Sequence, residues 1–147
     1  MRKRTQAREL ALMALYQTDI TRSSIEESLE VFWENHKAPP DVQEFATILT
    51  KGAMENLKAI DQVISQSADH WELPRMAAVD RNILRLATYE LLFLEEIPPK
   101  VTLNEAIDLA KKFGDIDSGR FVNGILDQIT KTAVKSSKKA SLHDGKE

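Results

Sequence analysis

The sequence of 147 residues contains no cysteine. This absence excludes a disulfide scaffold, a thiolate zinc site, an iron–sulfur cluster and a cysteine nucleophile. No apolar run approaches the ~18 residues that a membrane-spanning helix needs. The apolar stretch after the basic N-terminus is interrupted by charge and ends too early for a signal peptide. We therefore expect a cytoplasmic protein that does not enter a membrane.

The residue arrangements that support catalysis are also missing. The three histidines, His36, His70 and His143, are scattered, and no HExxH or other metal-binding spacing occurs. The segment from Gly119 to Gly124 lacks the lysine and the serine or threonine that complete a phosphate-binding loop. We expect no enzyme activity, no catalytic residues, no bound metal and no cofactor.

Glycine and proline are scarce, at five residues each, and no segment alternates apolar and polar residues long enough to predict a strand. Apolar residues instead recur with helical spacing, which predicts an all-α protein. The sequences beginning at Ser24 and Thr102 are capping boxes, which predict helix starts there. We expect helices over residues 5–19, 25–38, 41–64, 79–94, 102–113 and 118–133. The segment 41–64 could break near Gly52, and we favour one helix.

Leu73-Pro74 marks a joint between two halves of the chain. We expect two small helical bundles packed against each other, with about three helices each and six to seven in total. The N-terminal subdomain covers residues 1–73 and the C-terminal subdomain covers residues 74–134. Residues 135–147 are mostly polar, with little to bury, and are expected to form a disordered polar tail.

The net charge of −3 hides an uneven distribution along the chain. Residues 23–74 carry three lysines against ten acidic residues, whereas residues 1–22 and the tail are basic. An anionic partner would therefore meet the ends of the chain and avoid its middle. This pattern favours nucleic acid more than the net charge alone does.

The N-terminal basic residues form the first candidate RNA-binding cluster. Arg4 and Arg8 are four residues apart, so they share one face of the first predicted helix, and Arg2 and Lys3 precede them. Guanidinium groups bind phosphate oxygens bidentately, which suits a nucleic-acid backbone. The alternative is a basic terminus that only increases solubility.

Phe121 is the second candidate. The apolar stripe of the last predicted helix is complete without this ring, which lies about 100° from the centre of the stripe. With Arg120 and Asp117 beside it, the ring could stack on an unpaired base. Alternatively, Phe121 packs against the other half of the protein, and Asp117 serves only as a helix cap.

A third candidate site lies at the start of the predicted helix over 79–94. Its acidic residue, Asp80, complements the helix dipole there. The more specific interpretation of Asp80-Arg81-Asn82 is a surface that recognises a basic protein partner.

Several motifs together resemble the NusB family of bacterial transcription antitermination factors, over residues 2 to 129. The resemblance is specific in the C-terminal half and depends only on helix pattern over residues 20–70. The motifs that carry it are Ala7-Arg8-Glu9, Ala14-Leu15-Tyr16, Val79-Asp80-Arg81-Asn82-Ile83-Leu84-Arg85, Tyr89-Glu90-Leu91, Asn104-Glu105-Ala106-Ile107, Lys111-Lys112-Phe113-Gly114, Phe121-Val122-Asn123-Gly124 and Leu126-Asp127.

The resemblance implies an all-α fold of two helical bundles and a function in antitermination. Members of the family bind boxA RNA as a heterodimer with NusE, a small-subunit ribosomal protein, and act with RNA polymerase and other Nus factors. By resemblance, RNA would contact Arg2, Arg4, Arg8, Asp117 and Phe121, whereas NusE would contact Asp80 and Tyr16. From charge alone we add Lys3, Lys111 and Arg120 to the RNA-binding set. The remaining alternative is a helical adaptor that binds only protein.

Overall fold

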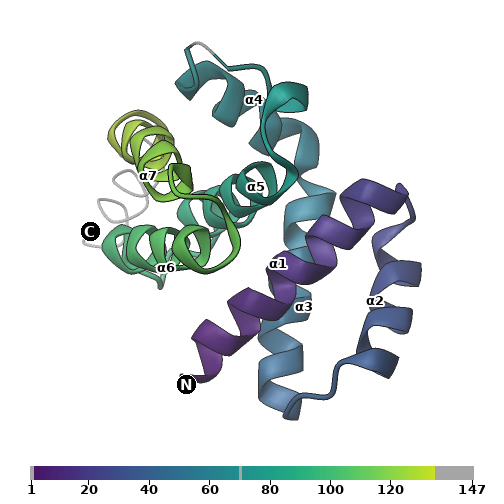
Figure 1. Ribbon diagram of the computed structural model, residues 1–147. Helices are drawn as coiled ribbons and strands as arrows, with labels where there is room; N and C mark the ends of the chain where they lie inside the picture. The colour runs from purple at the N-terminus through teal and green to yellow at the C-terminus, as the bar shows by residue number, and fades with distance from the viewer. Residues whose placement is uncertain (1, 70, 135–147) are drawn as a thin grey trace.

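The computed structural model describes residues 2–69 and 71–134. Within these residues the chain forms seven α-helices, joined by short connections and without a β-strand (Figure 1). The predicted all-α fold is therefore confirmed for this part of the chain. The expected tail over 135–147, together with His70 and His143, lies outside the described residues. None of the described helices is long and apolar enough to cross a membrane.

Helix α1 (Lys3–Thr21) packs most extensively on α3 (Pro40–Glu55). Its buried residues include Ala7, Ala11 and Ala14, whose small side chains let the neighbouring helices approach closely. The helix ends at Arg22, which adopts a left-handed backbone with φ of 59°. The Arg22 N–H donates to the carbonyl of Thr18 at 2.8 Å and so closes the last turn.

Helix α2 (Ile25–Asn35) begins where the sequence predicts. The Ser24 hydroxyl oxygen accepts a hydrogen bond from the Glu27 N–H at 3.2 Å, as its capping role requires. The buried side chains of Ile25, Leu29 and Phe32 form a small apolar cluster with α1. Helices α1, α2 and α3 therefore make one bundle (Figure 1).

The prediction of one helix over residues 41–64 is wrong. Helix α3 ends at Glu55, and α4 (Leu57–Ser67) begins after Asn56, whose backbone leaves the helical region with φ −112° and ψ 20°. The Asn56 amide donates to the Gly52 carbonyl at 2.9 Å and satisfies an acceptor at the end of α3. Helix α4 then turns away to pack on α5 and α7.

Helix α5 (Ala78–Phe93) lies at the centre of the molecule and contacts α1, α3, α4, α6 and α7 (Figure 1). Its fully buried residues include Ile83, Leu84 and Leu91, as expected for a central helix. Helices α4, α6 and α7 all pack on α5, which also contacts α1 and α3, and the division of the chain at residue 73 stays a prediction. A short 3-10 turn (Leu73–Arg75) joins α4 to α5.

Helix α6 (Pro99–Phe113) begins three residues before the predicted cap at Thr102, so that prediction is wrong. Proline has no N–H to satisfy and its fixed φ suits a first turn, which explains the earlier start. The Thr102 side chain is buried instead, and its hydroxyl donates to Glu90 Oε1 at 3.1 Å. Helix α7 (Ser118–Ile129) follows α6 and continues into a π-helical turn (Thr130–Val134).

Candidate nucleic-acid and partner interfaces

Arg8, predicted to bind RNA, lies inside the protein. Its side chain is 3% exposed and its Nε and Nη2 atoms both donate to the Glu90 carboxylate at 2.8 Å. Glu105 lies 3.4 Å from Nη1. Burial acts to lower the pKa of Arg8, but the Glu90 hydrogen bond and charge raise it above its ordinary value. We therefore remove Arg8 from the RNA-contact residues, because its guanidinium ties α1 to α5 and α6.

The other three N-terminal cations, Arg2, Lys3 and Arg4, are exposed, and we call them the first-turn cluster. Lys3 Nζ donates to Asp41 Oδ2 at 2.7 Å, and this hydrogen bond lowers the pKa of the exposed Asp41 carboxyl. The Arg4 guanidinium lies over the Phe45 ring at 4.3 Å from its centroid. This stacking orients Arg4 without neutralising its charge, so the group stays available to a phosphate.

A second cationic site lies between α6 and α7. It is a hollow of about 510 Å³, which we call the α6–α7 hollow, lined by Ile107, Lys111, Asp115, Ile116, Gly119, Arg120 and Asn123. The structure thus brings together two predicted residues, Lys111 and Arg120. Both are exposed, and neither forms an ion pair with another described residue. Ile116 is 97% exposed at its rim, so an apolar contact surface accompanies the two charges.

Helix α6 separates the first-turn cluster from the α6–α7 hollow. The α6 residues that bond to α1 are Glu105, which accepts from Thr5 at 2.7 Å, and Lys112, which donates to Glu9 at 2.9 Å. At 3.6 residues per turn, these two residues lie about 130° around the helix from Ile107 and Lys111. Figure 1 likewise shows α6 between α7 and the N-terminal end of α1. The two cationic sites are therefore separate surfaces, one on each side of α6.

Phe121 lies on the side of α7 away from the hollow. Its ring is half-buried against the core and meets the Trp71 ring edge to face, with centroids 5.5 Å apart and planes at 80°. Trp71 itself is 53% exposed, and no motif in the sequence points to it. The Phe121 ring is therefore neither deep among aliphatic side chains nor fully free. Part of its surface remains exposed, on the side of α7 away from the hollow that Arg120 lines.

Asp117 lies at the start of α7 and is exposed. Its carboxylate forms no helix-capping hydrogen bond, although its N–H donates to Asp115 Oδ1 at 3.0 Å. The Ser118 hydroxyl oxygen instead accepts from the Asp115 N–H at 3.0 Å and closes the loop. The predicted capping role of Asp117 is thus not seen, and its carboxylate faces solvent.

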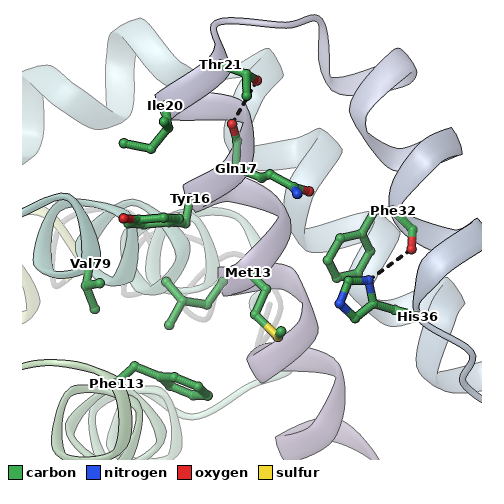
Figure 2. A pocket seen from close by; sticks show the side chains of 10 residues that line it. Met13, Tyr16, Gln17, Ile20, Thr21, Phe32, His36, Val79 and Phe113 are labelled. Atoms are coloured by element: carbon green, nitrogen blue, oxygen red, sulfur yellow. Dashed lines mark hydrogen bonds between the residues drawn. The ribbon is translucent and has the colours of Figure 1, made fainter.

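An apolar groove runs along the exposed face of α1, and we call it the α1 groove. It has a volume of about 410 Å³ and is lined by Leu12, Met13, Tyr16, Gln17, Ile20, Thr21, Phe32, His36, Val79 and Phe113. Figure 2 shows Tyr16 and Ile20 pointing to the side of Val79 and Phe113, with Phe32 and His36 on the opposite side of α1. Tyr16, predicted to meet a partner, is 41% exposed here. An exposed apolar surface of this kind is typical of a protein-binding site.

Asp80, the second predicted partner contact, is buried and 8% exposed. Burial raises the pKa of its carboxyl, the Ser118 hydrogen bond opposes this, and the Asp115 charge adds to it, so that the net shift is upward. Its Oδ1 atom has no hydrogen-bond partner in the structure. The Asp80 carboxyl is thus mostly covered by its own chain, whereas its neighbour Val79 lines the α1 groove, and contact of Asp80 with a protein partner stays a prediction.

The neighbours of Asp80 also have internal partners. Arg81 Nη2 donates to Asp19 Oδ2 at 2.9 Å, and Asn82 Nδ2 donates to the same oxygen at 3.0 Å. Burial alone would raise the pKa of Asp19, but the hydrogen bonds from these two residues lower it below its ordinary value. These bonds tie the end of α1 to the start of α5 and hold one side of the α1 groove.

Sequence patterns could have indicated part of the α1 groove. Helix α1 has apolar residues nearly all round, a pattern typical of a helix at the centre of a bundle, yet Met13 and Ile20 are exposed. These exposed apolar side chains line the α1 groove. Among the described residues, no group of three or more acidic or histidine side chains is placed to hold a metal ion.

Comparison with known proteins shows one family. Residues 5–131 match the model of the NusB family. The transcription antitermination protein NusB of Syntrophus aciditrophicus is 45% identical over 129 residues, covering 88% of this chain and 80% of that protein. The NusB protein of Desulfatibacillum aliphaticivorans is 46% identical, covering 88% of this chain and 90% of that protein.

Solved structures agree with the sequence comparison. A crystal form of T. maritima NusB matches with a TM-score of 0.83 and 40% identity, over 95% of this chain and 98% of that one. A structure described as antitermination factors NusB and NusE in complex with dsRNA matches with a TM-score of 0.80 and 34% identity, over 89% of this chain and 98% of that one. The family match, the identities and the shared fold together show that the chain belongs to the NusB family.

Proposed function

We propose that this protein is a cytoplasmic transcription antitermination factor that binds single-stranded boxA RNA together with NusE. In this role it supports processive transcription of ribosomal RNA operons and meets RNA polymerase and other Nus factors indirectly. Its work is binding, without a catalytic step. Support comes from family membership and from the similar structure that is described as NusB and NusE with RNA.

The observation that carries the RNA part of the proposal is the pair of exposed cationic surfaces on an acidic protein. The first-turn cluster and the α6–α7 hollow lie on two sides of α6, each with an arginine that has no carboxylate partner among the described residues. A strand that contacts both must cross α6, whose diameter with side chains is about 10–12 Å. Phe121, on the side of α7 away from the hollow, offers part of its ring to a base next to Trp71.

The partner part of the proposal concerns the α1 groove. We propose that NusE covers it with apolar side chains, because the groove is apolar and Tyr16 and Ile20 are exposed at its edge. Few cations face the RNA, so the free protein should bind boxA weakly and NusE should complete the site. Burial of the exposed apolar side chains supplies the driving force for this association.

The test is a fluorescence anisotropy titration of labelled boxA RNA with the protein alone and with equimolar NusE. We expect weak binding by the free protein and at least tenfold tighter binding with NusE, compared with a scrambled RNA of the same composition. Lys58→Ala is the control for alanine variants of the cations in the two sites. It removes the same charge, but Lys58 is exposed on α4 and lines neither cationic site.

The protein-only adaptor is the alternative that the α1 groove favours. It predicts that NusE binds tightly, that Ile20→Glu abolishes this binding, and that no RNA is retained by the complex. Val31→Glu is the matched control, since Val31 is also exposed and apolar but lies outside the groove. Retention of boxA RNA above the level of scrambled RNA would reject the adaptor.

A further inference from the structure

Asn123 in the α6–α7 hollow has no role in the fold. Its side chain is exposed, and its amide forms no hydrogen bond with any other described residue. Arg120 is three residues earlier, about 60° away around α7, so both side chains border the hollow from one helix. Lys111 borders it from α6. The hollow is thus lined by an amide and two cations that form no hydrogen bond or ion pair with another described residue.

Gly119 lines the hollow without a side chain, so it leaves the backbone of α7 open there. A Cβ at this position would meet only the Lys111 Cγ, at 3.8 Å, which is an ordinary contact. Internal packing therefore does not require glycine here, although glycine weakens a helix by up to about 1 kcal/mol relative to alanine. The open floor lets a flat ligand approach the backbone of α7.

The chemistry of the hollow favours a nucleotide over a bare phosphate. Asp115 lines it beside the two cations, and a carboxylate repels an inorganic anion. A nucleotide has both an anionic group for Lys111 or Arg120 and a base edge with hydrogen-bond donors and acceptors. A side-chain amide presents a donor and an acceptor next to each other, which matches the N6 amino group and N7 of adenine.

We propose that Asn123 is the residue that selects adenine at one position of the bound RNA. The inference rests on the proposed function, because it assumes that RNA occupies the hollow. Lys111 and Arg120 hold the flanking phosphates, which carry no sequence information. The Asn123 amide donates to adenine N7 and accepts from the N6 amino group.

The experiment compares wild type, Asn123→Ala and Gln128→Ala, each with NusE, on a series of boxA RNAs. In each RNA one adenine is replaced by 7-deazaadenine, which lacks the N7 acceptor, or by another base. Gln128 is the matched control because it is an exposed amide on the same helix outside the hollow. Asn123 has no internal bond, so Asn123→Ala should leave the melting temperature unchanged.

We expect one position at which 7-deazaadenine weakens wild-type binding by about 5- to 150-fold, the range for a bidentate base contact. Asn123→Ala should remove this discrimination at that position and leave the salt dependence of binding unchanged, whereas Gln128→Ala should retain it. A second variant, Gly119→Leu, should fold normally and weaken every RNA by filling the hollow.

Two results would overturn the inference while leaving the proposed function intact. One is an Asn123→Ala protein that keeps all single-position preferences of the wild type. The other is an equal loss of affinity for every RNA in the series, which would make Asn123 a contact to the backbone. If the wild type with NusE does not distinguish boxA from scrambled RNA at all, the proposed function itself fails.

Discussion

Arg8→Met tests whether a cation buried in the described part of the chain supports the fold or binds the ligand. The substitution keeps the aliphatic length of the side chain and removes two hydrogen bonds of 2.8 Å to Glu90. The Glu90 carboxylate, whose side chain is 2% exposed, is then left with the Thr102 hydroxyl as a hydrogen-bond partner. Removal of one member of a buried ion pair costs about 3–5 kcal/mol of stability.

The expected result is a loss of about 3–5 kcal/mol in the free energy of unfolding, measured by urea denaturation at neutral pH. For a domain of this size the loss lowers Tm by roughly 6–20 °C. The double variant Arg8→Met/Glu90→Met should be less destabilised than Glu90→Met and Arg8→Met added together, because neither charge is then buried alone. Lys112→Met is the control, since its pair with Glu9 is partly exposed and contributes at most about 1 kcal/mol.

RNA binding distinguishes a structural role of Arg8 from direct contact with RNA. At a temperature where Arg8→Met is folded, its affinity for boxA RNA with NusE should lie close to that of the wild type. Unchanged stability together with lost RNA binding would refute the reasoning, because Arg8 would then be a surface contact, as the sequence suggested.

Four further predictions follow from single contacts. Gly52→Ala should destabilise the fold by about 1–3 kcal/mol in urea denaturation, because an added Cβ would collide with the Tyr89 ring, whereas Gly124→Ala has open space and should be neutral or stabilising; equal effects would contradict this. Asp80→Asn should be more stable than wild type at pH 7, with the difference shrinking as the pH falls to about 3.5. Because the pKa of Asp80 is raised in the folded protein, the protonated carboxyl favours the folded state. This stabilisation is complete below the unfolded pKa of about 3.8 and is lost as the pH rises through the folded pKa. A stability difference between Asp80→Asn and wild type that does not change with pH would contradict this explanation. Phe121→Ala should weaken boxA binding by about 1–3 kcal/mol in anisotropy titrations with NusE, and a fall in Tm without a fall in affinity would assign the ring to packing alone. Ile20→Glu should weaken NusE binding at least tenfold in calorimetric titration while Val31→Glu does not, and equal affinities would exclude the α1 groove as the NusE site.

Local sequence rules predict the helices well where the cause is local. Ser24 caps α2 as expected. Pro40 and Pro99 are the first residues of α3 and α6 and set where those helices start, although the prediction for α6 followed the Thr102 capping box instead and was wrong. The errors arise where tertiary packing decides. The break at Asn56 has no strong local signal and follows from the burial of Ile60 and Ile64 against α5 and α7. Thr102 resembles a helix cap in sequence, but its hydroxyl serves the buried Glu90 carboxylate.

The errors among the site residues also arise where tertiary packing decides. Helical spacing places Arg4 and Arg8 on one face, but it does not reveal that Glu90, 82 residues later, takes Arg8 into the interior. Burial of Asp80 depends on how the start of α7 packs on α5, which spacing cannot supply. By contrast, Lys111 and Arg120 were chosen from charge alone and line the same hollow. The exposure of a charged side chain on an outer helix face can be predicted from the sequence. Near a helix crossing, whether the side chain is buried depends on a partner that is distant in the sequence.

One RNA strand is proposed to contact cations on both sides of α6, and the salt dependence of binding tests this most directly. The slope of log affinity against log salt should be measured with NusE for wild type, Arg4→Ala, Lys111→Ala and the double variant. Each single variant should reduce the slope by about 0.7 for a lost phosphate contact, the double variant by about 1.4, and the Lys58→Ala control by nothing. A wild-type slope in either single variant, with unchanged affinity, would contradict the claim that RNA spans both surfaces.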